Sequence, residues 1–276
     1  MEIFEIFNIL FTNPITNLLV GSYQLLNSTG IPHAFGLSII LLTIIIRLIL
    51  YPLVSAQLKS AHKMQKVAPH LQAVKEQHKD DKKRQQEEIM RLYREHGVNP
   101  VAGCLPLIVQ LPIIWSLYQV LITAVNVNSL TSLSKINSVL YFDFLKIDKV
   151  WSTDFFGVPL GKNPGDLMGT TPLIILVPVL TGVFQFILSK MMMPEVNPNL
   201  PQAPKKDKED FQAAFQKQSL FLFPVMIGFF SFTLPVGLSL YWNTFTIFGI
   251  LQQYILLGPG ALAPLLKKIN LHGEKK

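Results

Sequence analysis

Long apolar runs alternate with charged stretches along this chain, and the alternation predicts helices that cross a membrane. A transmembrane helix needs about 20 predominantly apolar residues. We predict five such spans, at 35–56, 101–125, 171–190, 218–235 and 237–257. Only a few residues around Pro235 separate the last two, so these spans should form an antiparallel pair with a tight turn. The pattern therefore predicts an all-α polytopic membrane protein.

The connections between these runs carry patterns of their own. Residues 1–34 predict an external segment with an amphipathic interfacial helix at 13–29, capped by Asn13 and ended by Gly30. The polar residues 57–100, rich in Ala, Gln, Lys and Glu, predict a cytoplasmic helical hairpin that turns near 78–82. The remaining segments are an external loop with a possible aromatic belt at 126–170, a cytoplasmic loop at 191–217 and a basic cytoplasmic tail at 258–276.

The distribution of charge predicts the orientation of the chain. Ten Lys and Arg residues lie in 57–100, and further lysines lie in 191–217 and in 258–276. Because cytoplasmic loops carry an excess of Lys and Arg, the N-terminus should lie outside and the C-terminus in the cytoplasm. Five crossings satisfy both ends. The net charge of +7 is then a topology signal, so we expect no DNA partner.

Arg47 is the only charged residue in the first apolar run, GLSIILLTIIIRLILYPLVSA at 36–56. It falls near mid-membrane, where a charge costs at least about 2.5 kcal/mol. None of the five predicted spans contains Asp or Glu, so Arg47 lacks an intramembrane carboxylate partner. This favours a hydrated cavity in which Arg47 meets an anion from elsewhere. The alternative is that Arg47 snorkels or ties helices together through carbonyl and glutamine groups.

Other polar side chains at membrane depth are candidates for the same groove. Thr43 lies four residues before Arg47, so both lie on one helix face. The other candidates come from the second, third and fifth spans, and they are Gln110, Gln185, Tyr241, Trp242 and Asn243. Each can instead be a contact between helices that binds no substrate.

The chain offers little chemistry for catalysis. No HExxH, GxSxG or phosphate-binding loop is present, and no His falls within a predicted span. The single Cys104 excludes an internal disulfide and a cysteine metal cluster. We therefore expect no enzyme, no metal site and no cofactor.

Three stretches together resemble the YidC family of membrane protein insertases. They are TIIIRLILYPLVSAQLKSAHKMQKVAPHLQAVKEQHKDD at 43–81, VNPVAGCLPLIVQLPIIWSLYQVL at 98–121 and LPVGLSLYWNTFTIFGILQQYIL at 234–256. The resemblance implies five core helices around a hydrophilic groove that is open to the cytoplasm and to lipid. It also implies that the groove arginine is Arg47, with Thr43, Gln185 and Trp242 at groove positions. An apolar slide for a client helix is implied at Leu111, Pro112, Ile114 and Phe230.

The resemblance implies insertion and folding of membrane proteins without ATP, in a bacterial plasma (inner) membrane or, as an alternative, a thylakoid membrane. The expected partners are nascent membrane-protein clients and the lipid bilayer. The ribosome, the signal recognition particle or its receptor, and the Sec translocon are further candidates. Two other interpretations stay open: a small-solute or anion transporter that uses Arg47, and a chaperone bound to a Sec-type channel.

Overall fold

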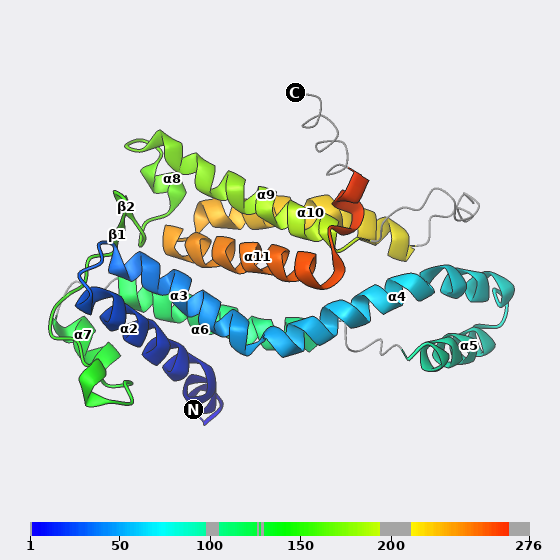
Figure 1. Ribbon diagram of the computed structural model, residues 1–276, viewed down its shortest axis with the longest axis horizontal. Coiled ribbons are helices and arrows are strands. Elements are labelled where there is room, and N and C mark those ends of the chain that lie inside the picture. The colour runs from blue at the N-terminus through cyan, green and yellow to red at the C-terminus, as the bar shows by residue number, and fades with distance from the viewer. Residues whose placement is uncertain (1, 98–104, 126, 128–129, 194–210, 265–276) are drawn as a thin grey trace. The chain divides into compact units, whose positions relative to one another are not determined.

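The computed structural model describes residues 2–97, 105–125, 127, 130–193 and 211–264, and most of them are helical (Figure 1). The predicted all-α fold is confirmed at this level. The α-helices are α1 (Glu2–Phe7), α2 (Asn13–Ser28), α3 (Ala34–Ile49), α4 (Tyr51–Gln77), α5 (Lys82–Glu95), α6 (Leu105–Val125), α7 (Leu130–Asn137), α8 (Pro164–Leu167), α9 (Leu176–Met191), α10 (Phe211–Thr233) and α11 (Val236–Leu257).

Short elements complete the described chain. A π-helical segment joins α1 to α2, 3₁₀ segments lie in the loops, and the strands form one antiparallel pair. These elements are η1 (Asn8–Thr12), η3 (Asp143–Leu145), η4 (Pro172–Ile175), η5 (Gly260–Leu262), β1 (Asp154–Phe155) and β2 (Val158–Pro159). The strands pair Asp154 with Pro159 and Phe155 with Val158.

The chain divides into two compact units that share helices. The first consists of Met1–Ile49, Val109–Phe186 and Leu222–Phe248, and the second of Leu50–Ile108, Ile187–Phe221 and Gly249–Lys276. The predicted site residues all belong to the first unit. The predicted functional site is therefore contained in one compact unit.

Helix α2 packs along α3 in the first unit (Figure 1). Its buried face includes Ile15 and Leu19, together with Asn17, whose side chain donates to the Val139 carbonyl and accepts from the Tyr141 N–H. The prediction that Asn13 caps this helix is wrong, because helical backbone continues through Thr12 into η1. The helix ends at Ser28, and Gly30 follows with a φ of +71°, as predicted.

In the second unit, α4 and α5 are separated by residues 78–81 and contact each other. The Gln85 side chain donates to the Lys75 carbonyl across this turn at 2.9 Å. Asp81 caps α5 by accepting from the Arg84 N–H at 3.0 Å. The cytoplasmic location of these helices stays a prediction. The motif around Cys104, most of the Pro-rich stretch 191–210 and residues 265–276 lie outside the described residues.

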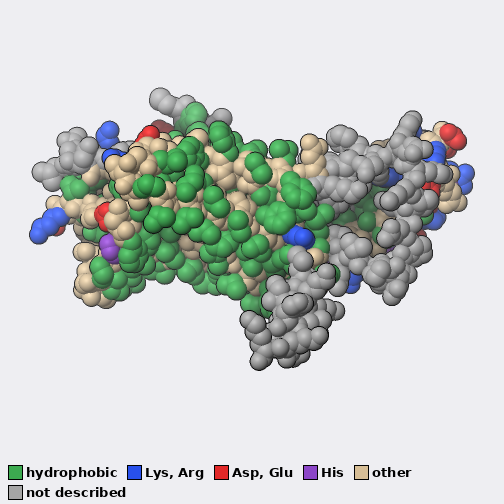
Figure 2. Space-filling view, turned by 90° about the horizontal axis from the view of Figure 1, so that it is seen from above, with side chains coloured by type: hydrophobic (Ala, Val, Ile, Leu, Met, Phe, Trp, Pro, Cys, Tyr) green, Lys and Arg blue, Asp and Glu red, His purple; other side chains and the backbone are tan. Residues whose placement is uncertain are grey.

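Within the described ranges, one helix, Pro172–Met191, is long and apolar enough to cross a membrane alone. Ala34–Ile49 and Tyr51–Gln77 meet the same test jointly, and Gln110–Val125 and Leu220–Thr233 are shorter apolar helices. The five predicted spans therefore stay a prediction. Apolar side chains predominate on the face shown in Figure 2. Val225 and Phe229 of α10 are 71% and 64% exposed, as expected of a helix that faces lipid.

Aromatic side chains of the connection between α6 and α9 differ in their exposure to solvent. Phe142, Phe144 and Phe156 are exposed, which agrees with a position at a membrane surface. Trp151 is instead buried, its ring stacks on Phe35 at 5.3 Å between centroids, and its indole N–H donates to the Ala124 carbonyl. The aromatic belt predicted within 126–170 would include Trp151, and for this residue the prediction is wrong, because its side chain is part of the core.

Candidate functional site

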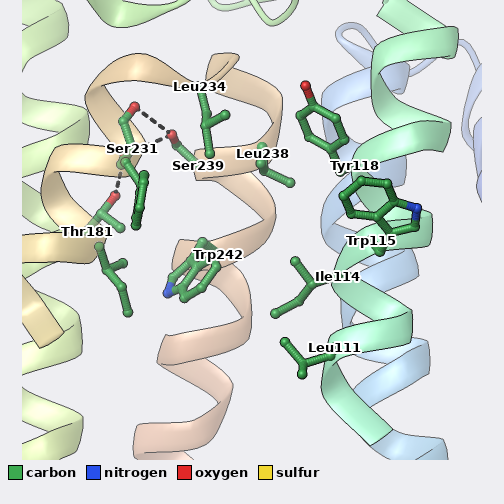
Figure 3. A pocket seen from close by; sticks show the side chains of 12 residues that line it. Leu111, Ile114, Trp115, Tyr118, Thr181, Ser231, Leu234, Leu238, Ser239 and Trp242 are labelled. Carbon is green, nitrogen blue, oxygen red and sulfur yellow. Dashed lines mark hydrogen bonds between the residues drawn. The ribbon is translucent and has the colours of Figure 1, made fainter. Parts of the chain in front are cut away.

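Three of the four predicted slide residues line one pocket of about 310 Å³ in the first unit. Leu111 and Ile114 extend from α6 toward Trp242 of α11, and the hydroxyl-bearing residues of α9 and α10 lie on the opposite side (Figure 3). Phe230 of α10 also lines the pocket. Leu111 is 58% exposed and Phe230 is 49% exposed, so both are accessible to a partner. Pro112 lies within α6 but does not line the pocket.

A chain of three hydroxyls forms part of this otherwise apolar pocket wall. Ser231 lies 3.1 Å from the Thr181 hydroxyl and 2.8 Å from the Ser239 hydroxyl, and all three residues are buried (Figure 3). Thr181 also donates to the Val177 carbonyl, at 2.8 Å. These bonds satisfy the buried hydroxyls and tie α9, α10 and α11 together at the pocket.

Two glycines allow the helices behind this wall to approach closely. A Cβ at Gly182 would lie 3.3 Å from the Pro224 carbonyl oxygen, and one at Gly228 would lie 3.3 Å from the Pro178 carbonyl oxygen. Such small-residue contacts between helices are common in membrane proteins, where backbones pack against each other directly. The close contact of α9 with α10 fixes Thr181 beside Ser231.

Arg47 occupies a second cluster, in which an aromatic side chain of α11 covers its guanidinium. The Arg47 Cζ lies 3.4 Å from the ring centroid of Phe245 and 5.8 Å from that of Phe248. Arg47 Nη2 donates to the Phe245 carbonyl at 2.5 Å, while the buried Nε has no hydrogen-bond partner. Within the described ranges, Arg47 forms no ion pair. The cation is therefore held by a ring and a carbonyl, and its buried Nε–H has no acceptor.

Tyr241 extends this cluster along the same face of α11. Its ring lies 5.7 Å from that of Phe245, and its hydroxyl accepts a hydrogen bond of 3.1 Å from the Gln110 side chain. Residues 241, 245 and 248 follow helical spacing, so one stripe of α11 carries all three aromatic side chains. The structure thus brings together three predicted residues: Arg47, Gln110 and Tyr241.

The other predicted polar residues have different surroundings. Thr43 is fully buried, and its hydroxyl donates to the Ile39 carbonyl one turn earlier at 2.6 Å. The Trp242 indole N–H donates a long hydrogen bond of 3.5 Å to the Gln185 side chain. Asn243 Oδ1 is buried without a hydrogen-bond partner. Helix α11 thus holds Tyr241 in the arginine cluster and its neighbour Trp242 in the apolar pocket.

A family model described as 60Kd inner membrane protein matches residues 26–259. This match covers far more than half of the chain. The chain belongs to the YidC family. The membrane protein insertase YidC 1 of Halalkalibacterium halodurans is 32% identical over 248 residues, which are 88% of this chain and 78% of that protein. The membrane protein insertase MisCA of Bacillus subtilis is 32% identical over 229 residues, 82% of this chain and 71% of that protein.

Members of the YidC family differ in how much of their length this chain matches. The membrane protein insertase YidC of Caulobacter vibrioides is 32% identical over 247 residues, which are 90% of this chain but only 36% of that protein. The chain thus spans about a third of this longer relative. The family match at residues 26–259 contains both clusters described above.

Phe245 and Phe248 were missed by the reasoning from sequence, although they form the immediate surroundings of Arg47. The usable signal was their spacing with Tyr241, which repeats at four and three residues along the last apolar run. The same spacing is common on lipid-facing helices, so it did not single these residues out. Within the described residues, no three His, Cys, Asp or Glu side chains gather into a metal site.

Proposed function

We propose that this chain is a membrane protein insertase and chaperone, which inserts integral membrane proteins and helps them fold without ATP. The observation that carries the proposal is the pocket lined by Leu111, Ile114, Phe230 and Trp242, in a chain of the YidC family. The relatives reported above are named as membrane protein insertases. An accessible apolar pocket between helices suits a client helix, which is itself apolar.

Apolar side chains of the client's transmembrane helix are the proposed occupants of the pocket, because about 310 Å³ holds a few side chains and not a whole helix. Leu111 and Phe230 lie on opposite helices, so a client helix between them is in contact with protein on its way into lipid. Burial of apolar surface contributes roughly 25 cal/mol per Å², and a client helix of about 20 residues gains enough from this to drive insertion. No ATP site is required for such a step.

Arg47 is the proposed partner of the polar segment that precedes or follows the client helix. In the structure, the guanidinium is held by the Phe245 ring and carbonyl, and its Nε has no partner. A carboxylate accepts two parallel hydrogen bonds from an arginine, which is stronger than one bond to a neutral carbonyl. An acidic client segment therefore competes with Phe245 for Arg47. The membrane potential assists its outward movement by about 2.3 kcal/mol per charge per 100 mV.

The other proposed partners belong to the cytoplasmic side. The charged helices α4 and α5 and the basic tail suit clients that emerge from a ribosome, and the signal recognition particle, its receptor and the Sec translocon are further candidates. The basic residues equally suit anionic lipid. Membership of the YidC family supports location in a bacterial membrane. The distribution of Lys and Arg along the sequence is what favours an N-terminus outside and a C-terminus in the cytoplasm.

Photo-cross-linking to a stalled client tests the proposed path directly. A photoreactive amino acid is placed at Leu111 or Phe230, and ribosome-bound single-span clients of increasing length are presented to inverted membranes. The matched control is Leu180 of α9, which is 44% exposed but does not line the pocket. We expect cross-links from the two pocket positions over a defined range of client lengths. Equal cross-linking from Leu180, or none from the pocket, would contradict the proposal.

A further inference from the structure

A second cavity of about 410 Å³ lies in the first unit, and Trp115 is the one described lining residue that it shares with the pocket of Figure 3. Residues of α1, η1, α2, α6, α7 and the outer loop line it. Its volume is within the roughly 300–1,000 Å³ that is typical of small-molecule sites. The function proposed above does not use this cavity.

The lining of this cavity contains both apolar and polar side chains. The buried apolar residues of the lining are Leu19, Val20 and Val120. The side chain of Trp151 is also buried and lines the cavity. The polar lining residues are Asn8, Thr12, Asn13, Thr16, Gln119, Thr123 and Lys135. A ligand that fits such a lining has an apolar body and a polar end.

The charge of the lining has one sign. Among the described residues that line the cavity, Lys135 is the only charged one, and none is Asp or Glu. Lys135 also forms no ion pair within the described part of the chain. Lys146 in the same loop differs, because it binds Asp143 at 2.6 Å and thereby holds the pKa of that carboxyl below its usual value. The polar end of the ligand should therefore carry negative charge.

The backbone at the cavity is unusual in a way that supports a binding role. In η1, the Asn13 N–H bonds to the Asn8 carbonyl five residues earlier, which is the π-helical pattern. Single π-helical turns within α-helices occur frequently at functional sites. Here the turn begins and ends at the cavity-lining residues Asn8 and Thr12, and the Thr12 hydroxyl lies 3.3 Å from that of Ser116 on α6.

We propose that this cavity binds one anionic phospholipid, with an acyl chain against Trp151 and the headgroup phosphate at Lys135. The bilayer that surrounds a YidC-family protein supplies this ligand. A lysine binds phosphate as a point charge, and the side-chain amides of Asn8, Asn13 and Gln119, which also line the cavity, carry N–H donors for further phosphate oxygens. The proposal does not depend on insertase activity.

The bound lipid would also affect the client pocket through Trp115. This side chain is 58% exposed and lines both cavities. An acyl chain on one side of the indole restricts the positions it can take on the other. The bound lipid therefore affects the pocket of Figure 3 by restricting the conformations of Trp115.

Quenching of Trp151 by brominated lipid tests the proposal. The chain has three tryptophans, so a Trp115→Phe, Trp242→Phe variant leaves Trp151 as the only reporter. The variant is placed in phosphatidylcholine nanodiscs that contain a small fraction of phosphatidylglycerol with brominated acyl chains. Trp151 is 4% exposed, so lipid outside the cavity reaches it poorly. Circular dichroism and the melting temperature confirm that the variant folds.

We expect brominated phosphatidylglycerol to quench Trp151 at fractions where brominated phosphatidylcholine does not. The expected preference is about fivefold, the ratio that corresponds to about 1 kcal/mol for one lysine near anionic lipid. Lys135→Ala should abolish the preference, whereas Lys149→Ala should keep it, because Lys149 is an exposed lysine of the same loop that does not line the cavity. No quenching, equal quenching by both lipids, or an unchanged preference in Lys135→Ala would overturn the proposal.

Discussion

The guanidinium of Arg47 lies over the ring of Phe245, 3.4 Å from its centroid, and donates to the carbonyl of the same residue. One residue of α11 thus supplies both an aromatic face and a hydrogen-bond acceptor for a buried cation. A cation–π contact contributes about 2 kcal/mol or more when it is desolvated, so this arrangement offsets part of the cost of burying Arg47. In the proposed function, an anionic client segment has to compete with Phe245 for Arg47.

Phe245→Leu should make Arg47 more reactive toward phenylglyoxal, a reagent that modifies arginine. The substitution removes the ring but keeps the backbone carbonyl. Loss of about 2 kcal/mol of cation–π attraction corresponds to a roughly thirtyfold increase in the fraction of accessible Arg47. The rate is measured by mass spectrometry of the peptide that contains Arg47.

Phe248→Leu is the matched control for that experiment. Its ring centroid lies 5.8 Å from Arg47, close to the limit of about 6 Å for a cation–π contact. We expect a much smaller increase in the rate of modification than with Phe245→Leu. Equal rates in both variants and the unmodified protein would show that Phe245 does not control access to Arg47.

Sequence reasoning found Arg47 because a charge in an apolar run costs free energy wherever the helix packs. The sequence does not single out Phe245, because an aromatic residue in an apolar helix can equally well pack in the protein core, lie at an interface between helices or contact lipid. The choice depends on the rotation of α11 about its own axis, which long-range packing sets. The same limitation applies to Trp151, which reads as a surface aromatic in a loop but is buried against Phe35.

Ser231→Ala should lower the melting temperature, because Ser231 bonds to the hydroxyls of both Thr181 and Ser239. The expected loss is about 1 kcal/mol, since both partners keep a backbone acceptor. Thr233→Ala is the control, because its exposed hydroxyl bonds only to the Phe230 carbonyl. A thermal unfolding series in detergent measures both. Identical melting temperatures for the two variants would contradict the account of the pocket wall.

Gly228→Leu should destabilise the contact between α9 and α10. A Cβ at this position already lies 3.3 Å from the Pro178 carbonyl oxygen, so a larger side chain must separate the helices. Overpacking of this kind costs about 1–3 kcal/mol, which exceeds the gain in helix propensity of roughly 1 kcal/mol at most. Gly169→Leu is the control, because a Cβ there meets no atom within 4 Å. Equal melting temperatures for both variants would show that the helices do not depend on this close approach.

Leu111→Ser should slow client insertion without unfolding the protein. The side chain is 58% exposed, so its loss affects a partner more than the core. Removing a leucine from a contact costs about 1.5–3 kcal/mol when it is fully buried by the partner, and less when burial is partial. The rate of insertion of a single-span client is compared with that of Leu180→Ser, which lies outside the pocket. Similar rates for the two variants would remove the pocket from the client's path.

The polar residues predicted to line one groove do not all belong to one site. Arg47, Gln110 and Tyr241 form one cluster, which is compatible with the membrane depth predicted for each of them. Thr43 instead bonds to its own helix, and Trp242 belongs to the apolar pocket. Spacing along one helix gives the face of each residue, but only the packing of several helices decides which faces meet.

Insertion of a client by the purified protein alone is the most direct test of autonomous insertion through Arg47. The protein is reconstituted in liposomes with a single-span client that carries a short acidic tail, and protease protection of the tail is scored for the unmodified protein, Arg47→Lys and Arg47→Ala. We expect protection with the unmodified protein, loss with Arg47→Ala, and substantial recovery with Arg47→Lys, which restores the charge. Equal protection in the unmodified protein and Arg47→Ala, or no protection in any of them, would contradict autonomous insertion through Arg47.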